Sequence, residues 1–329
     1  MRDPAFWHET DLRSRRSAPL TRLMLSPIAG IYAWAGARRI KTTEPFKADS
    51  PVICVGNLTV GGSGKTPVVA ALLDWFQARG HRAASLSRGY KGELTGPLKV
   101  DMTEHTARMV GDEPLMLACS GEAWIGADRV EAAKEMTANG VDIIIMDDGH
   151  QNPTLHKDLS LVVIDAGNPY GNGFVFPKGP LREPVDRGLA RADAVIMVGE
   201  QTSDHPEISR VGTPVLNASI SPRGPAPTGP LVAFAGIGRP QKFFDTLEES
   251  GGELVETVPF PDHHTYSDGD VKYLRQLASE RSARLITTEK DFVRLKEQER
   301  EGVLAFPITV DIPQSDIDAL LEPVLKLIQ

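Results

Sequence analysis

The sequence predicts an α/β fold: a mostly parallel sheet with helices on both faces, a smaller C-terminal α/β unit and an N-terminal helical segment. Continuous apolar runs such as Val141–Met146 and Leu159–Asp165 are typical of strands buried on both faces. These runs alternate with segments of helical periodicity, which favours a parallel sheet covered by helices. The same alternation restarts after a Pro- and Gly-rich stretch, and this restart predicts the second unit.

Composition limits the classes of protein to consider. A chain of 329 residues is long enough for about two domains, and its 41% hydrophobic and 24% charged residues are typical of a globular protein with a sizeable core. The net charge of −8 argues against a nucleic acid partner. Two cysteines, Cys54 and Cys119, exclude a disulfide framework, and no Cys/His cluster has the spacing of a zinc site.

Residues 1–40 differ from the rest because they carry seven arginines against three acidic residues. They also contain an uncharged stretch of 15 residues, 23–37, which is shorter than the ~20 apolar residues that span a bilayer. A signal peptide, a helix packed on the protein and a segment in the membrane interface are the alternatives. We favour the third, a peripheral membrane segment, in which Trp7, Tyr32 and Trp34 suit an interfacial location.

The elements predicted after this segment divide the chain into three parts. Residues 41–220 form the main unit, residues 221–230 with four prolines and two glycines form a linker, and residues 231–329 form the smaller unit. The expected strands are 51–55, 83–87, 98–100, 141–146, 159–165, 194–198, 231–235, 254–258 and 284–288. The expected helices are 68–79, 112–118, 127–138, 241–250, 268–279 and 316–328.

A glycine-rich turn joins the first strand to the first helix of the main unit and ends in Gly64-Lys65-Thr66. Strand, Gly-rich loop and helix in this order form a phosphate cradle, in which backbone N–H groups and the helix N-terminus bind phosphate oxygens. Lys65 would reach the outer phosphates of a nucleotide, and the Thr66 hydroxyl would bind Mg²⁺. The loop is a variant P-loop because Thr59 stands where the usual pattern has Gly. The predicted nucleotide-binding residues are Thr59, Val60, Gly61, Gly62, Ser63, Gly64, Lys65 and Thr66.

Asp147 and Asp148 end a buried strand, and Gly149-His150-Gln151 follows. Side chains at the carboxyl ends of parallel strands face the ligand crevice of an open α/β sheet. Beside a P-loop, an aspartate there can bind Mg²⁺. The alternative is a solvated turn.

Other polar positions have two readings each. Asp112 in the sequence GDEP is either a cap of the next helix or the base that takes a proton from an attacking hydroxyl. His263 in PDHH is either structural or functional. Arg182 and Glu183 could bind a phosphate and a metal, or form a surface ion pair. Arg88 and Arg129 are either anion-binding groups or solvated charges.

Eight motifs follow one another along nearly the whole chain. They are VGNLTVGGSGKTP (55–67), SRGY (87–90), GDEP (111–114), MDDGHQNP (146–153), GPLREP (179–184), FAGIGRPQKFF (234–244), PDHH (261–264) and TTEKD (287–291). Taken together, these motifs resemble those of the tetraacyldisaccharide 4′-kinase family, the lipid A 4′-kinases. Thr59 in the loop is also usual in that family, whereas His150 departs from the aromatic residue that we expect at its position.

The resemblance implies transfer of the ATP γ-phosphoryl group to the 4′-hydroxyl of tetraacyldisaccharide 1-phosphate, at the cytoplasmic face of the bacterial inner membrane. It implies ATP and Mg²⁺ as cofactors, a lipid substrate, contact with the membrane surface and no obligate protein partner. Its implied catalytic residues are Asp112 as base, His263 as the group that tunes this base, and Lys65. Its implied remaining site residues are Gln151 for the nucleotide, Thr66, Asp147, Asp148 and Glu183 for the metal, and Arg88, Arg129 and Arg182 for the substrate.

A protein of another class remains the alternative. A nucleotide-switch protein, either a GTPase or a metal-insertion ATPase acting on a protein partner, would also carry a Gly-Lys-Thr loop and a strand-terminal aspartate. The sequence contains no N-K-x-D stretch for guanine recognition and no Cys or His pair near the loop. These features favour the kinase.

Overall fold

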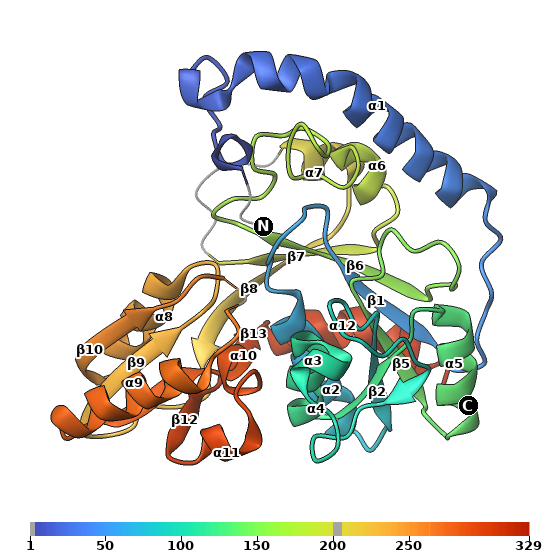
Figure 1. Ribbon diagram of the computed structural model, residues 1–329. Coiled ribbons are helices and arrows are strands. Elements are labelled where there is room, and N and C mark those ends of the chain that lie inside the picture. The colour runs from blue at the N-terminus through green and yellow to red at the C-terminus, as the bar shows by residue number, and fades with distance from the viewer. Residues whose placement is uncertain (1–3, 200–205, 263, 329) are drawn as a thin grey trace.

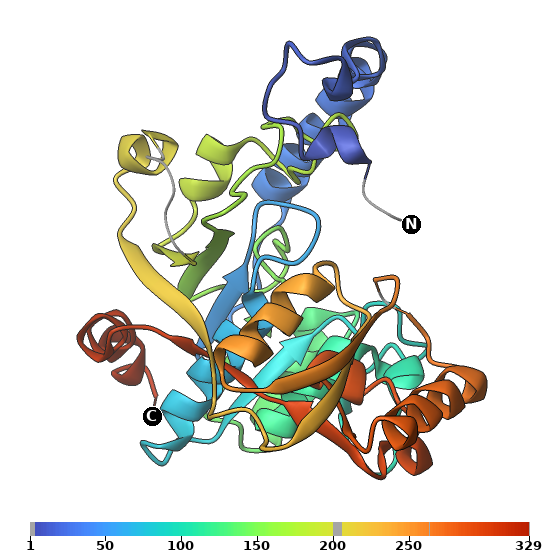
Figure 2. The ribbon, with the colours of Figure 1, turned by 90° about the vertical axis from the view of Figure 1, so that its left-hand side faces the viewer.

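The structure is a computed structural model and describes residues 4–199, 206–262 and 264–328. Two sheets with helices on both of their faces confirm the predicted α/β fold (Figures 1 and 2). The large sheet consists of β1 (Val52–Gly56), β2 (Ala83–Ser87), β3 (Leu98–Lys99), β4 (Glu122–Ile125), β5 (Ile143–Asp147), β6 (Leu159–Asp165), β7 (Ala194–Val198), β8 (Val215–Pro222) and β13 (Ile308–Asp311).

The central position of β1 determines at which point of the sheet edge a ligand would bind. The strand order is β13-β8-β7-β6-β1-β5-β2-β4-β3, parallel throughout except for the antiparallel edge strands β3 and β13. The chain runs from β1 to β2 and β4, returns to β5 on one side of β1, and continues to β6 on the other side. The strand order thus reverses at β1, and ligands of open α/β sheets bind at such a switch point. Val55 pairs with Asp147, so the loop after β1 and the aspartates after β5 share one edge.

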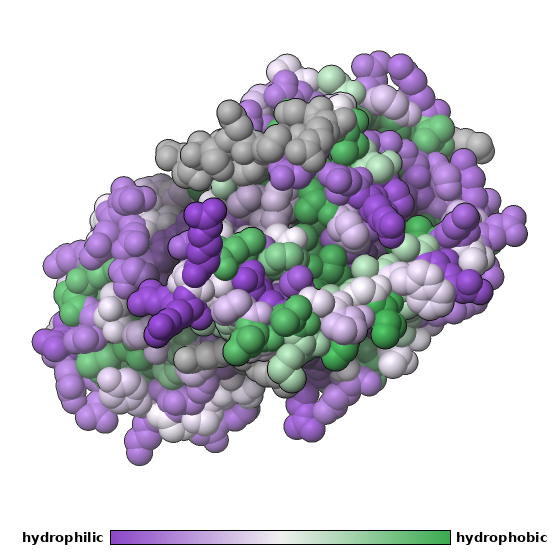
Figure 3. Space-filling view, turned by 90° about the horizontal axis from the view of Figure 1, so that it is seen from above, coloured by the Kyte–Doolittle hydropathy of each residue, from purple (hydrophilic) through white to green (hydrophobic). Residues whose placement is uncertain are grey.

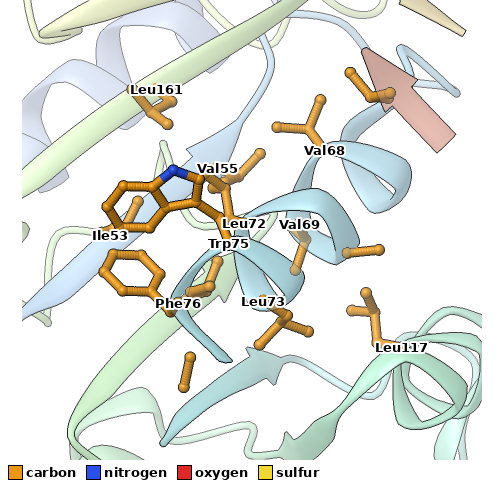
Figure 4. Close-up of a cluster of buried hydrophobic side chains, with 14 of the residues drawn as sticks. Ile53, Val55, Val68, Val69, Leu72, Leu73, Trp75, Phe76, Leu117 and Leu161 are labelled. Carbon is orange, nitrogen blue, oxygen red and sulfur yellow. The ribbon is translucent and has the colours of Figure 1, made fainter. Parts of the chain in front are cut away.

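Alternation along each strand separates the two faces of the large sheet. Ile53 and Val55 pack against α2, where Phe76 and Trp75 lie edge to face with ring centroids 4.8 Å apart (Figure 4). On the other face of the sheet, Val52 and Cys54 of β1 belong to a second core that also contains Ala132, Ala133 and Met136 of α5. The helices of this unit are α2 (Lys65–Gln77), α3 (Ala107–Val110), α4 (Asp112–Ser120), α5 (Arg129–Ala138), α6 (Val185–Leu189), α7 (Pro206–Val211) and α12 (Gln314–Leu325).

The smaller sheet is parallel throughout, in the order β10-β9-β11-β12. Its two faces have separate cores: Phe243, Phe244 and Leu247 of α8 pack on one, and Val271 and Leu274 of α9 pack on the other. The elements of this unit are β9 (Pro230–Ala235), α8 (Pro240–Glu249), β10 (Glu253–Pro259), α9 (Asp268–Glu280), β11 (Arg284–Thr288), α10 (Glu289–Phe292), α11 (Glu297–Arg300) and β12 (Val303–Phe306).

The end of the chain returns to the large sheet, whereas the sequence analysis placed residues 231–329 together. Strand β13 pairs with β8, and helix α12 buries Ile317, Leu321 and Val324 in the core that contains α2. The Asp318 carboxylate accepts hydrogen bonds from Trp75 Nε1 at 2.9 Å and from Arg79 Nη2 at 2.7 Å. The apolar stripe of α12 predicts a helix but does not indicate which of the two cores it covers. The packing of α12 on the large sheet could therefore not be predicted from the sequence.

Helix α1 (Pro19–Thr42) lies along one side of the large unit (Figure 1). Many of its large apolar side chains are exposed, on the face of the molecule that Figure 3 shows. None of the helices in the described residues combines the length and apolar character needed to cross a bilayer. The sequence analysis placed Trp7 at the membrane interface, but the structure buries this side chain, which is 5% exposed. Trp7 Nε1 donates to the Pro177 carbonyl at 3.1 Å, and the Trp7 ring packs edge-on against Phe176. The exposed large apolar side chains of α1 are Leu20, Leu23, Met24, Ile28, Ile31, Tyr32 and Trp34.

Candidate nucleotide and acceptor site

The loop after β1 curls back on itself and delivers the chain into α2. The Asn57 side chain donates to the Gly61 carbonyl at 3.4 Å, and Gly61 and Gly64 adopt φ values of 116° and 84°. Both values lie in the region that favours glycine, so the curl depends on these residues. Helix α2 begins at Lys65, which places its positive N-terminal end at the loop. This geometry fits the predicted phosphate cradle.

Lys65, Asp148 and Arg182 meet at the mouth of the loop. Arg182 binds the Asp148 carboxylate through two nitrogens at 2.9–3.0 Å, while its Nε donates to the Thr59 carbonyl at 3.1 Å. Lys65 Nζ lies 3.6 Å from Asp148 Oδ1. Burial alone would raise the pKa of Asp148, but the charges of Lys65 and Arg182 hold it below its usual range. The structure therefore unites three residues that the sequence analysis selected from separate motifs.

The neighbouring Asp147 has the opposite environment. It is 2% exposed, and its Oδ1 has no hydrogen-bond partner among the described residues. Burial, with a contribution from the charge of Glu113, raises the pKa of Asp147 to about 7. A buried carboxylate oxygen without a partner costs free energy, and a cation at this position would remove that cost.

The predicted metal set is not assembled around one point. Within the described residues, no three His, Cys, Asp or Glu side chains lie close enough together to hold a metal ion. Glu183 accepts hydrogen bonds from Arg191 Nη2 at 2.7 Å and from Gln151 Nε2 at 3.1 Å. Burial would raise the pKa of Glu183, but Arg191 and Gln151 hold it below its usual range. Sequence reasoning missed Arg191, because a lone arginine after a short helix has no distinguishing pattern.

Gln151 and His150 have separate tasks. The Gln151 side chain also donates to the Asn57 carbonyl at 2.9 Å, which ties it to the nucleotide loop. His150 is 2% exposed; its Nδ1 lies 3.1 Å from Ser160 Oγ and its Nε2 lies 3.0 Å from the Gly188 carbonyl. A Cβ on Gly56 would lie 2.4 Å from the His150 Cβ, so the strand end and this turn are closely packed. His150 is therefore a structural residue packed against the end of β1.

Arg129 is buried beside a second cation. It is 4% exposed, its Nη1 donates to the Gly126 carbonyl, and its Nε has no partner among the described residues. Burial and the charge of the exposed Arg88 lower the pKa of Arg129 to about 10. Two cations held close together, one with an unused buried donor, favour binding of an anion.

Asp112 lies in the first turn of α4, and Gly111 occupies the cap position of that helix. The Asp112 carboxylate accepts hydrogen bonds from Arg294, which belongs to the smaller unit. The charge of Glu113, the residue after Asp112, contributes to the raised pKa of Asp147. The start of α4 therefore lies near the end of β5. Sequence reasoning missed Arg294, because 182 residues separate it from Asp112.

The predicted His263 lies outside the described residues. Its neighbour Asp262 is exposed, and the next residue, His264, places Nε2 3.2 Å from Asp270 Oδ2. The His264 ring also stacks on Phe260, with ring centroids 4.7 Å apart. The second histidine of the PDHH motif is thus a structural residue of the smaller unit.

Comparison with known proteins gives consistent matches over most of the chain. A family model described as tetraacyldisaccharide-1-P 4′-kinase matches residues 21–326. The tetraacyldisaccharide 4′-kinase of Hyphomonas neptunium is 56% identical over 328 residues, which cover 99% of this chain and 98% of that protein. The same enzyme of Maricaulis maris is 48% identical over 332 residues, covering 99% and 97%. The crystal structure of LpxK from Aquifex aeolicus in complex with ATP has a TM-score of 0.74 at 26% identity, covering 92% of this chain and 99% of that one.

The environment of His150 predicts a pH dependence of stability. Burial and the charges of Arg191 and Lys157 lower the pKa of His150 from 6.5 to about 4. The unfolded chain therefore binds a proton at higher pH than the folded chain. The contribution of neutral His150 is complete above pH 6.5 and is lost as the pH falls towards 4, by up to about 3 kcal/mol.

Urea denaturation of the protein and of His150→Phe between pH 4 and 8 measures this effect. We expect a shallower decline of stability below pH 6.5 in His150→Phe, while the control His156→Phe, at a more exposed histidine, keeps the original slope. An unchanged slope in His150→Phe would contradict the assignment.

Proposed function

The chain belongs to the tetraacyldisaccharide 4′-kinase family, lipid A kinases that use ATP, and we propose that the crevice at the end of β1 is where this reaction occurs. The reaction transfers the γ-phosphoryl group to the 4′-hydroxyl of tetraacyldisaccharide 1-phosphate. The contact of Lys65 with Asp148 carries this proposal, because it joins the phosphate-binding loop to the carboxylates at one sheet edge. Family membership decides against the nucleotide-switch alternative.

ATP binds along the loop from Thr59 to Thr66, with Lys65 and the backbone amides of the loop around the β- and γ-phosphates. Gln151 supports this loop through its bond to the Asn57 carbonyl. The unpartnered Asp147 Oδ1 fits a divalent cation, and the Thr66 hydroxyl would hold the same Mg²⁺. Asp148 and Glu183, whose carboxylates are bound to arginines in this structure, would release these arginines and lie close to the bound Mg²⁺. Bound Mg²⁺ supplies neutralisation of phosphate charge.

Asp112 acts as the base in the proposed mechanism. As the 4′-hydroxyl oxygen attacks the γ-phosphorus, its proton passes to the Asp112 carboxylate, and the bond from phosphorus to the ADP oxygen breaks. Lys65 stabilises the charge that develops on the transferred group. His263 is proposed to tune Asp112, as the family resemblance implies.

The acceptor is an anionic lipid, and two regions match its chemistry. Arg88, Arg129 and Arg182 are proposed to bind its phosphate and the transferred group, supported by the buried, partly unused guanidinium of Arg129. The exposed apolar side chains of α1 are proposed to enter the membrane interface and bring the crevice to the acyl chains. We accordingly propose a peripheral location on the cytoplasmic face of the inner membrane.

A transfer assay tests the function. Purified protein, γ-labelled ATP, Mg²⁺ and detergent-dispersed tetraacyldisaccharide 1-phosphate should give labelled lipid. We expect Lys65→Ala to reduce the rate at least about 100-fold, because Lys65 stabilises the transferred group. Absence of label in the lipid, from folded protein that binds ATP, would refute the proposed reaction.

Asp112→Asn tests the base. The amide keeps the shape of the side chain but cannot accept the proton, so we expect kcat to fall by about 10²–10⁴-fold while the Kd for ATP changes little. Steady-state kinetics and calorimetric titration with ATP measure the two quantities. Glu113→Gln, on the adjacent residue of the same helix turn, is the matched control and should lose much less. A wild-type rate in Asp112→Asn would remove it as the base.

The double variant Leu23→Ser/Ile31→Ser tests the membrane segment. Both side chains are at least 66% exposed, so the change should leave folding intact. Each loses burial in the interface, and we expect binding to phosphatidylethanolamine/phosphatidylglycerol vesicles to fall about tenfold or more in a flotation assay. Tyr273→Ser/Leu327→Ser, at exposed residues on other elements, is the control. Equal binding by all three proteins would exclude α1 as the anchor.

A further inference from the structure

We propose that Arg294 is a positioning residue that orients Asp112, so that the base is set for reaction only while the smaller unit is docked on α4. The proposal rests on the role of Asp112 stated above. Arg294 lies just after α10 in the smaller unit, and Asp112 begins α4 in the larger unit. The pair is thus a direct link between a candidate catalytic residue and the position of the other unit.

The geometry of the pair fixes the carboxylate. Arg294 Nη2 donates to Asp112 Oδ2 at 2.5 Å, and Arg294 Nε donates to the same oxygen at 3.1 Å. The side chains are 7% and 12% exposed, so water screens the pair little. Charge-assisted hydrogen bonds of this kind are strong and directional. Two donors on Oδ2 therefore hold the carboxylate in place through one of its oxygens.

The smaller unit holds the other side of the guanidinium. Arg294 Nη1 donates to Asp291 Oδ1 and to the Gly236 carbonyl, both at 2.8 Å. Asp291 is completely buried, and its Oδ2 accepts from the Gly236 N–H at 2.9 Å and from Thr288 Oγ1 at 2.8 Å. Arg294 is therefore clamped to the end of β9 and the start of α10. The smaller unit thus holds the guanidinium to which the Asp112 carboxylate binds.

The residue next to Arg294 also packs against the large unit, so the two units are in contact at this position. Val293 is 2% exposed and lies in the core of the large unit, although its sequence neighbours belong to the smaller one. Separation of the units at this point would expose Val293 and withdraw Arg294 from Asp112 together. Loss of a merely structural ion pair would loosen docking and change the KM for ATP together with the rate, whereas loss of the positioning role lowers the rate alone.

This difference determines the experiment, a double-mutant cycle on phosphoryl transfer with Asp112→Asn and Arg294→Gln. Single-turnover measurements with enzyme in excess keep slow rates readable. We expect Arg294→Gln to lower the rate about 10–100-fold with the KM for ATP changed less than about threefold. In the Asp112→Asn background, the same change should cost less than about threefold. Arg294→Lys, which keeps the charge but not the planar fork, should be intermediate.

Arg239→Gln is the matched control. It breaks another ion pair between the units, Arg239 Nη2 to Asp165 Oδ2 at 2.9 Å, without touching Asp112, and should change the rate less than about threefold. Equal losses from Arg294→Gln in both backgrounds, an unchanged rate, or an equal loss in Arg239→Gln would overturn the proposal. If Arg294→Gln does not fold, Arg294→Lys is placed in the same cycle and judged by the same criteria.

Failure of the proposed function can be distinguished from failure of the proposal for Arg294. A wild-type protein that labels no lipid would refute the reaction, and a fully active Asp112→Asn would refute the base, in both cases before Arg294 is considered. A cycle in which the wild type is active and Asp112→Asn is impaired tests Arg294 alone.

Discussion

Complete or partial burial of carboxylates at the carboxyl edge of a parallel sheet is the constraint on which this site depends. Such groups are costly unless a positive charge compensates them. Arg182 and Lys65 compensate Asp148, Arg191 compensates Glu183, and Arg294 compensates Asp112. Each cation comes from a different segment, so their convergence depends on the complete fold.

Asp147 and Asp148 are consecutive in the sequence, but their local environments shift their pKa values in opposite directions. Asp148, beside cations, has a pKa below its usual range, whereas burial raises the pKa of Asp147 to about 7. Environments that push the pKa values of neighbouring acids apart are frequent at functional sites. The sequence shows only two adjacent carboxylates after an apolar run, and their difference arises from the complete burial of Asp147 and from the two cations that contact Asp148.

Much of the large unit was predictable because its signals are local. Strands such as Ala83–Ser87 and Leu159–Asp165 were predicted with their observed bounds, since continuous apolar runs have few alternatives in an α/β protein. Strand β8 was missed because polar residues interrupt it, and β13 because it is a short edge strand. Arg191 and Arg294 were missed for another reason. Their importance comes from contacts across the fold, and a single sequence carries no local pattern for these.

The return of β13 and α12 to the large sheet gives the smaller unit a particular mechanical setting. That unit is joined to the larger one at both ends, through the segment between β8 and β9 and the segment between β12 and β13. Because β8 and β13 pair with each other, these two connections leave from adjacent strands. A unit attached at two adjacent points can rotate about them but cannot move away freely. Contacts outside these connections, such as those of Arg294 and Arg239, then set how closely the unit approaches the edge of the large sheet.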